Sequence, residues 1–111
     1  MTRSIPESDW RYLQGIKNEL IDRLCRRINE KAAAIVAGPG NSSHETYLRL
    51  YKHLQKSDRI VADCFNDWRR STVWGTLHLL RRHELLGDDQ FEHLSEETQE
   101  LICALEALAN G

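Results

Sequence analysis

Helix start and stop signals divide this chain into segments whose apolar residues recur at helical spacing. The S-x-x-E capping box, in which a serine hydroxyl and a glutamate carboxylate each accept a backbone N–H at a helix start, is matched at Ser4–Glu7 and at Ser42–Glu45. Gly-Pro-Gly at 38–40 stops a helix and forces a turn. Gly87 ends a second apolar run, and Ser95 opens the last helix. These signals predict an all-α protein.

The first two segments are long. Residues from about 5 to 37 are expected to form one helix, because apolar residues return every three or four positions. The second segment begins at 42 or 43 and carries a narrow stripe with alternating steps of four and three, the spacing of a coiled-coil seam. The stripe comprises positions 47, 51, 54, 58, 61, 65, 68 and 72.

Asp58 interrupts this stripe. It either caps a new helix at a break or is a buried polar residue with a partner. A single helix from 43 to 86 would be about 65 Å long at 1.5 Å per residue, which is long for a chain of this size. A break is therefore expected at 56–58 or within 69–75.

The chain is expected to fold as a single helical domain over residues 1–111, which is enough for one hydrophobic core. The predicted architecture is a bundle of about four helices. Two long antiparallel helices are joined by the 38–43 turn, and the 88–109 segment folds back as a C-terminal helix.

The composition predicts a cytoplasmic protein. No apolar run approaches the roughly 20 residues needed to cross a bilayer, and the N-terminus lacks the apolar stretch of a signal peptide. The three cysteines, Cys25, Cys64 and Cys103, are odd in number and far apart, unlike a disulfide framework. Because they lie along apolar stripes, they are expected to be unpaired and mostly shielded.

Charge is distributed unevenly along the chain. Residues 1–87 hold fifteen Lys or Arg and ten Asp or Glu, a net charge of +5, whereas residues 88–111 hold seven acids and no base. Such a split is typical of a nucleic-acid-binding protein with an acidic tail. It also fits a tail that docks on the basic part of its own bundle.

No local motif indicates catalysis, a cofactor or a metal. The five histidines show none of the H-x-x-x-H, H-E-x-x-H or Glu-x-x-His spacings, and no C-x-x-C occurs. Asp63 and Asp67 lie one turn apart beside Arg59 and Arg70, which is typical of a solvated salt-bridge face. The 38–43 loop matches neither phosphate-binding pattern. We therefore expect no cofactor and no metal, and a small enzyme is the least favoured functional class.

Three arginine pairs, at 26–27, 69–70 and 81–82, are the most informative polar feature. In a helix over 69–86, one face apart from the coiled-coil stripe combines arginine with tryptophan and leucine, a composition typical of interface hot spots. It also suits phosphate contacts with aromatic stacking. This candidate interaction face comprises Arg70, Trp74, Leu77 and Arg81. Three alternatives could cover this face: the acidic C-terminal helix of the same chain, a partner or second subunit, or a nucleic acid.

The sequence thus predicts a non-enzymatic protein–protein interaction or regulatory module. A homodimer or larger oligomer is expected, because long amphipathic helices with a heptad seam often complete their cores across a two-fold axis. An unidentified protein partner is a further possibility at the candidate face. A nucleic-acid-associated regulator that uses the arginine pairs is the alternative function, followed by a small enzyme with no local motif. No membrane partner is expected.

Overall fold

The computed structural model describes residues 4–40 and 42–110, and every regular element within them is helical. The α-helices are α1 (Glu7–Ala37), α2 (Ser43–Val61), α3 (Val73–Arg82), α4 (Asp88–Glu92) and α5 (Glu96–Asn110). A π-helical turn, Ala62–Asn66, and a 3-10 turn, Arg70–Thr72, lie between α2 and α3. The all-α prediction is confirmed. The described residues form five α-helices rather than about four.

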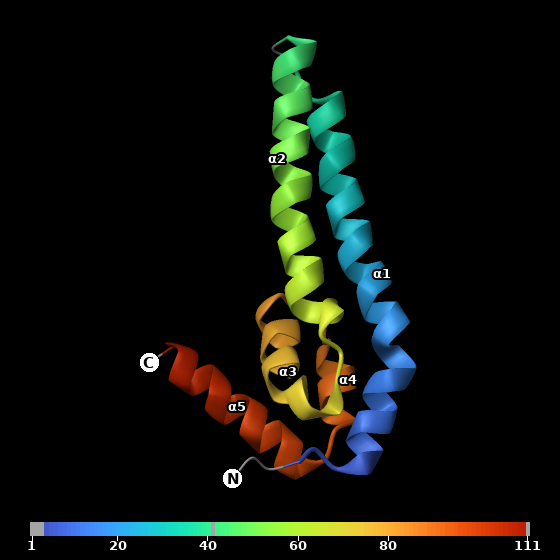
Figure 1. Cartoon of the computed structure of the whole chain (residues 1–111), viewed down its shortest axis with the longest axis vertical. Coiled ribbons are helices and arrows are strands. Elements are labelled where there is room, and N and C mark those ends of the chain that lie inside the picture. Colours follow the sequence, from blue (N-terminus) through green and yellow to red (C-terminus); the bar gives the residue numbers. More distant parts are fainter. Residues whose placement is uncertain (1–3, 41, 111) are drawn as a thin grey trace.

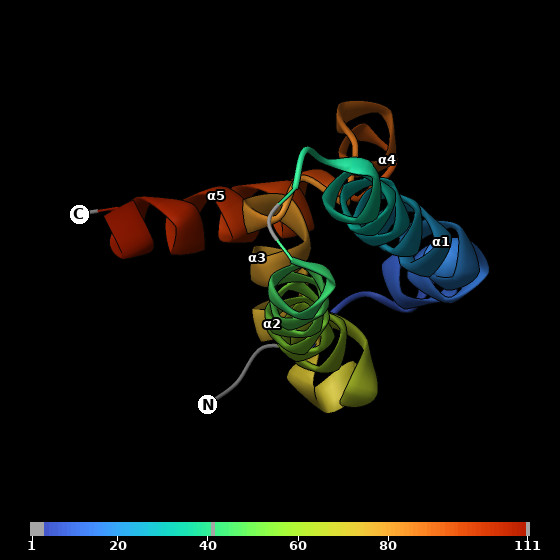
Figure 2. The ribbon, with the colours of Figure 1, turned by 90° about the horizontal axis from the view of Figure 1, so that it is seen from above.

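α1 and α2 lie side by side and project well beyond the other helices, which gather around the N-terminal half of α1 (Figure 1). The molecule is accordingly elongated, with extents of 54 × 31 × 22 Å. We call residues 25–61 the arm and the remaining described residues the base. α5 contacts α3 at the base and leads away from the arm (Figure 2), so it does not run along the two long helices.

The hydrophobic core lies in the base. Its buried apolar side chains come from positions 5–24 and 64–102: Ile5, Leu13, Leu20, Leu24, Cys64, Phe65, Val73, Leu77, Leu80, Leu85, Leu86, Leu94 and Ile102. Between residues 25 and 63, as far as the chain is described, no apolar side chain is buried, and only Ser57 is. The two helices of the arm therefore contact each other through half-buried residues, without a core of their own.

The helix starts are partly as predicted. Ser42 caps α2, because its hydroxyl accepts the Glu45 N–H at 3.2 Å. The Ser4–Glu7 capping box does not form. Pro6 is the N-cap of α1, with φ −55° and no side-chain cap. The Glu7 carboxylate instead accepts a hydrogen bond from Arg70 at 3.0 Å.

The break in the second segment lies at 67–72, overlapping the 69–75 stretch. α2 continues through 56–58, where Ser57 is buried with its hydroxyl 3.4 Å from His53 Nδ1. Asp58 is exposed, so it is neither the cap of a break nor a buried polar residue. The π-helical turn that ends this helix places two consecutive side chains, Cys64 and Phe65, in the core.

Trp68 fixes the break against α1. Its indole N–H donates to Gln14 Oε1 at 2.8 Å. Its ring centroid lies 6.2 Å from that of Trp10 and 5.9 Å from that of Phe65, and the Lys17 ammonium lies 5.2 Å above the ring. Aromatic and cation–π contacts of this kind each contribute about 0.5–1 kcal/mol beyond burial of area. The end of α2 is therefore held firmly on the base.

Candidate interaction surfaces

Of the four residues of the predicted interaction face, Trp74, Leu77 and Arg81 lie on α3, whereas Arg70 does not. Arg70 lies in the 3-10 turn before α3 rather than in a helix over 69–86. Its guanidinium donates to the Glu7 carboxylate at 3.0 Å and to the Ile5 carbonyl at 2.8 Å. Leu77 is fully buried in the core and Trp74 is half-buried. Because helical alignment stops at the 3-10 turn, Arg70 faces the N-terminal segment instead of sharing a face with Trp74.

Arg81 lies in the last turn of α3 and contacts the segments that follow. Its guanidinium donates to the Leu86 carbonyl at 3.0 Å and to Asp88 at 3.2 Å, and its Nε lies 3.7 Å from Glu106 of α5. Its Cζ lies 4.5 Å from the ring centroid of Phe91. The acidic C-terminal helix thus meets Arg81, while Arg70 is occupied by the N-terminal residues.

The arginine pairs are used mainly within the fold. Arg26 is 3.0 Å from Asp22, one turn away on α1. Arg69 is 2.6 Å from Asp67, and this hydrogen bond, with the positive charge, lowers the pKa of the Asp67 carboxyl. Arg82 is exposed. Because five of the six paired arginines contact carboxylates or carbonyls, they do not form a free cationic surface.

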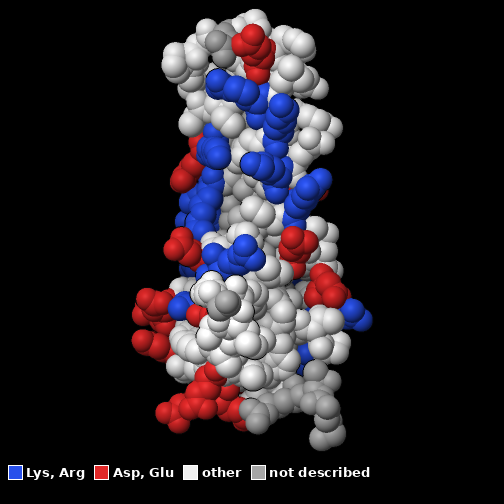
Figure 3. Space-filling model, turned by 90° about the vertical axis from the view of Figure 1, so that its left-hand side faces the viewer, with Lys and Arg blue, Asp and Glu red and all other residues white. Residues whose placement is uncertain are grey.

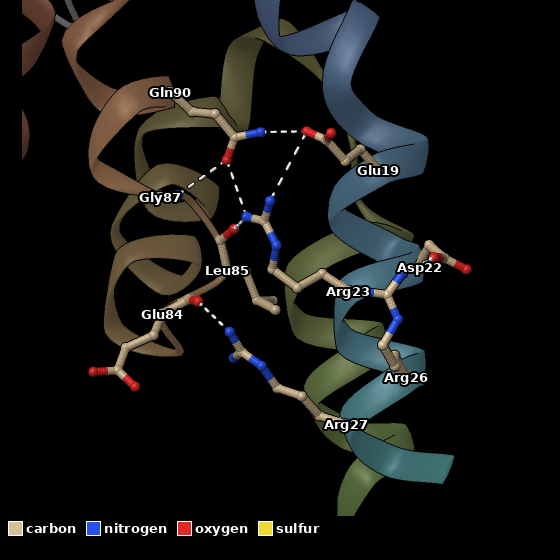
Figure 4. Close-up of polar contacts among 9 residues, drawn as sticks. All are labelled: Glu19, Asp22, Arg23, Arg26, Arg27, Glu84, Leu85, Gly87 and Gln90. Atoms are coloured by element: carbon tan, nitrogen blue, oxygen red, sulfur yellow. Dashed lines mark hydrogen bonds and ion pairs between the residues drawn. The ribbon is translucent and has the colours of Figure 1, made fainter. Parts of the chain in front are cut away.

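Arg23 and Arg27 of α1 bind backbone carbonyls of the segment that directly follows α3 (Figure 4). Arg27 donates to the His83 carbonyl at 2.9 Å and to the Glu84 carbonyl at 2.7 Å, and Arg23 donates to the Leu85 carbonyl. Glu84 has a φ of 56°, the left-handed conformation that often ends a helix. Positive side chains are favoured at the negative end of a helix dipole. These two arginines therefore attach the end of α3 to α1.

A buried carboxylate connects the start of α1 to the start of α5. Asp9 is only 3% exposed and accepts hydrogen bonds from Ser95 N at 2.9 Å, Ser95 Oγ at 2.7 Å and Thr98 Oγ1 at 2.5 Å. Ser95 Oγ also accepts the Thr98 N–H at 3.3 Å, as expected for a helix start. Asp9 therefore acts as a capping residue from another helix, which sequence spacing does not reveal.

The arm exposes an apolar flank. α2 faces α1 with half-buried or buried residues at 46, 50, 53, 57 and 60, and His53 Nε2 lies 2.9 Å from the Ile28 carbonyl oxygen. The predicted stripe lies beside this one, so Tyr47, Tyr51 and Leu54 are 59%, 51% and 44% exposed. We define these three residues as the apolar flank. Beside them, a groove of about 430 Å³ runs between Ile28, Tyr51, Leu54 and Val61.

The other side of the arm is basic. Arg49, Lys52, Lys56 and Arg59 follow one another at steps of three and four and so form one stripe of α2, and Lys31 of α1 lines the same groove as Lys56. All five are exposed. Figure 3 shows the Lys and Arg side chains gathered over the arm and many of the acids over the base. We define these five residues as the basic flank.

The His, Cys, Asp and Glu side chains of the described residues are not gathered into a metal-binding cluster. No group of three or more His, Cys, Asp or Glu that could hold a metal occurs among them. Cys64 is buried, and burial raises the pKa of its thiol to about 11, so it is a poor nucleophile at neutral pH. Cys25 is half-buried, and Cys103 is exposed, so the predicted shielding is wrong for Cys103.

A cavity of about 640 Å³ lies where α3, α4 and α5 meet. His78, Arg81 and Glu106 are among its lining residues, but Arg81 already contacts both Asp88 and Glu106. Across the described ranges, no helix is long and apolar enough to cross a membrane.

The two flanks of the arm are thus the exposed surfaces with the most distinctive chemistry. One carries large apolar side chains, and the other carries five cations. Comparisons with protein-family models, with curated proteins and with solved structures find no match to this chain.

Proposed function

We propose that this chain is a non-enzymatic protein–protein interaction module of the cytoplasm, and that its antiparallel α1–α2 arm pairs with the arm of a second copy. The observation that carries this proposal is the exposed apolar flank on an arm that has no buried apolar residue of its own. Tyr47, Tyr51 and Leu54 are spaced by four and three, which is the pattern of a helix completed by another helix.

The placement of charge supports pairing through this flank. At about 100° per residue, Arg49 and Lys56 lie on nearly the opposite side of α2 from Tyr47 and Tyr51. Two copies can therefore meet through their tyrosines while their basic flanks point outward. About two helix diameters, roughly 20 Å, would separate the two sets of cations, which exceeds the Debye length of about 8 Å at physiological salt. The product is a four-helix bundle made of two arms.

The apolar flank is sufficient for a moderate affinity. From its exposed fractions and ordinary side-chain areas, it contributes roughly 300 Å² per copy. At about 25 cal/mol per Å², two copies gain about 15 kcal/mol, most of which offsets the 4–15 kcal/mol cost of association. We therefore expect a dimer with a micromolar dissociation constant rather than an obligate one.

The oligomeric mass tests this proposal. Sedimentation velocity and light scattering across the micromolar range should give a mass that rises from 12.9 kDa toward twice that value. Tyr51→Ser with Leu54→Ser should remain monomeric and folded, because both side chains are largely exposed in the single chain. Leu48→Ser is the matched control, since Leu48 is 41% exposed but lies outside the flank. A monomer at all concentrations, or equal effects of both variants, would contradict the proposal.

A further inference from the structure

The cations of the basic flank lack acidic partners among the residues that the structure describes. Arg11, Arg23, Arg26, Arg69, Arg70 and Arg81 each have a carboxylate within 4.0 Å. In the part of the chain that is described, none of the five basic-flank residues has one. Arg49 contacts only a backbone carbonyl, that of Ile35, at 3.4 Å. The positive charge of this flank is therefore not neutralised by the fold.

The charge of the surrounding segment has the same sign. Residues 26–60 contain seven Lys or Arg and only three Asp or Glu. On α2, the basic residues from Arg49 to Arg59 span about 15 Å of helix. Unpaired charges on such a surface raise the local concentration of an oppositely charged ligand and speed its association.

An apolar floor lies within this basic surface. The groove between α1 and α2 has a volume of about 490 Å³, within the range of ligand pockets. Leu24, Ile28 and Ile60 contribute its apolar lining, while Lys31 and Lys56 line it from the two helices. The groove thus offers apolar contact with a cation from each helix beside it.

We propose that this basic groove binds an acidic amphipathic helix of a partner protein. Apolar side chains of that helix would cover the half-buried Ile28 and Ile60, and its flanking carboxylates would meet Lys31, Lys56 and the neighbouring cations. This is the helix-in-groove mode of recognition, with charge complementarity setting the orientation.

The lining favours such a helix over a nucleic acid. Sequence-tolerant nucleic-acid binding relies on aromatic side chains that stack on bases, together with cations that contact phosphates. The arm's tyrosines, Tyr47 and Tyr51, lie on the apolar flank, away from the basic stripe. The groove has apolar side chains at its floor and cations beside them. A helix with leucine-type side chains flanked by carboxylates is complementary to both.

Fluorescence anisotropy with a designed peptide tests the proposal. The probe is a labelled helical peptide of about 16 residues, with leucine at i, i+3, i+4 and i+7 and glutamate on both sides of that stripe. We expect it to bind the full chain, and Lys31→Glu with Lys56→Glu to weaken binding at least about tenfold. Arg11→Glu with Arg82→Glu is the matched control, because it makes the same charge change at the base and should leave affinity within about twofold.

Altered probes separate the chemistries. A peptide with glutamine in place of glutamate, and one with serine in place of leucine, should both lose binding. Undiminished binding of the serine peptide would overturn the proposal, since any polyanion would then suffice. Tighter binding of a single-stranded oligonucleotide than of the peptide would also overturn it. The proposal would also be overturned if Arg11→Glu with Arg82→Glu weakened peptide binding as much as Lys31→Glu with Lys56→Glu.

The outcome is separable from that of self-association. The Tyr51→Ser, Leu54→Ser variant should bind the peptide as the unmodified chain does, because the two flanks lie on different sides of the arm. Sedimentation of Lys31→Glu with Lys56→Glu should leave the oligomeric mass unchanged. Loss of self-association in that variant would identify a second copy as the occupant of the groove and overturn the proposal.

Discussion

Substitution of Asp9 should show how much the base depends on one buried carboxylate. Asp9→Ala removes the acceptor of three hydrogen bonds, two from Ser95 and one from Thr98. The Thr98 side chain is 0% exposed, so water cannot readily replace the carboxylate at its hydroxyl. The start of α5 also loses a negative charge beside its backbone N–H groups.

The expected loss of stability is the sum of two contributions. The buried Thr98 hydroxyl loses a charged acceptor and keeps Ser95 Oγ, 3.1 Å away, as its partner; loss of a hydrogen bond to a charged group costs about 1.5–3 kcal/mol. Loss of the cap at Ser95 costs about 1 kcal/mol, since its N–H is left without an acceptor while its hydroxyl can still bond Thr98 N. We therefore expect about 3 kcal/mol less free energy of unfolding. With a urea m-value of about 1.5 kcal/mol/M, the midpoint should fall by roughly 2 M.

Equilibrium urea unfolding followed by circular dichroism measures this change. Glu7→Ala is the control, because Glu7 lies two residues away on α1 in largely exposed ion pairs and should cost less than about 1 kcal/mol. A double-mutant cycle of Asp9→Ala with Thr98→Val should give a coupling energy above about 1 kcal/mol. Equal effects of Asp9→Ala and Glu7→Ala, or a coupling near zero, would refute the reasoning.

Three further outcomes concern Arg27 and the cysteines Cys64 and Cys103. Arg27→Ala should lower the free energy of unfolding by about 1.5–3 kcal/mol in the same urea assay, because Arg27 binds the carbonyls of His83 and Glu84, just after α3. The control is Arg26→Ala, which removes only an exposed ion pair and should cost less than about 0.5 kcal/mol. A larger loss of stability in Arg26→Ala than in Arg27→Ala would contradict this prediction. In native buffer, a thiol reagent should label exposed Cys103 first and Cys64 only on unfolding. The raised pKa of Cys64, about 11 against an ordinary 9.0, means that its contribution to stability is complete below pH 9 and is lost as pH rises through 11. Cys64→Ala should remove that part of the alkaline destabilisation, and an unchanged pH profile would contradict a raised pKa for the Cys64 thiol in the folded chain.

Local features of the sequence predicted the helices well. Ser42 and Ser95 lie at helix starts, and α1 ends at Ala37, directly before the Gly-Pro-Gly turn. These signals act within a few residues of backbone, so no knowledge of tertiary contacts is needed. The Ser4–Glu7 box did not form: Pro6 rather than Ser4 is the N-cap of α1, and the Glu7 carboxylate is bound by Arg70, a residue distant in sequence.

Contacts between distant segments were beyond such signals. Asp9 and Ser95 look like a first-turn acid and an ordinary N-cap, and nothing in their spacing shows that they bond each other. The face of Arg70, Trp74, Leu77 and Arg81 assumed one continuous helix. The 3-10 turn over Arg70–Thr72 separates the first of these residues from the others. Propensity alone does not locate that turn, because Trp68 holds it through tertiary contacts.

The stripe of α2 shows how an apolar pattern can mark a surface rather than an intrachain contact. Two neighbouring stripes of this helix share the heptad step, and the one that faces α1 contains Thr46, His53 and Ser57. The more apolar stripe, with Tyr47 and Tyr51, stays exposed. This exposed apolar surface is the observation on which the proposed self-association rests.

The division between base and arm separates the hydrophobic core from the surfaces that we propose for binding. Every buried apolar side chain of the described residues lies in the base, where polar contacts such as Asp9–Ser95 and Arg70–Glu7 join segments distant in sequence. Substitutions on either flank of the arm remove little burial, and should therefore change association without unfolding the chain. A protein built only for stability would place its tyrosines against its own helices. In the two proposals made above, the exposed tyrosines on one side and the cations on the other are two contact surfaces carried by one stable base.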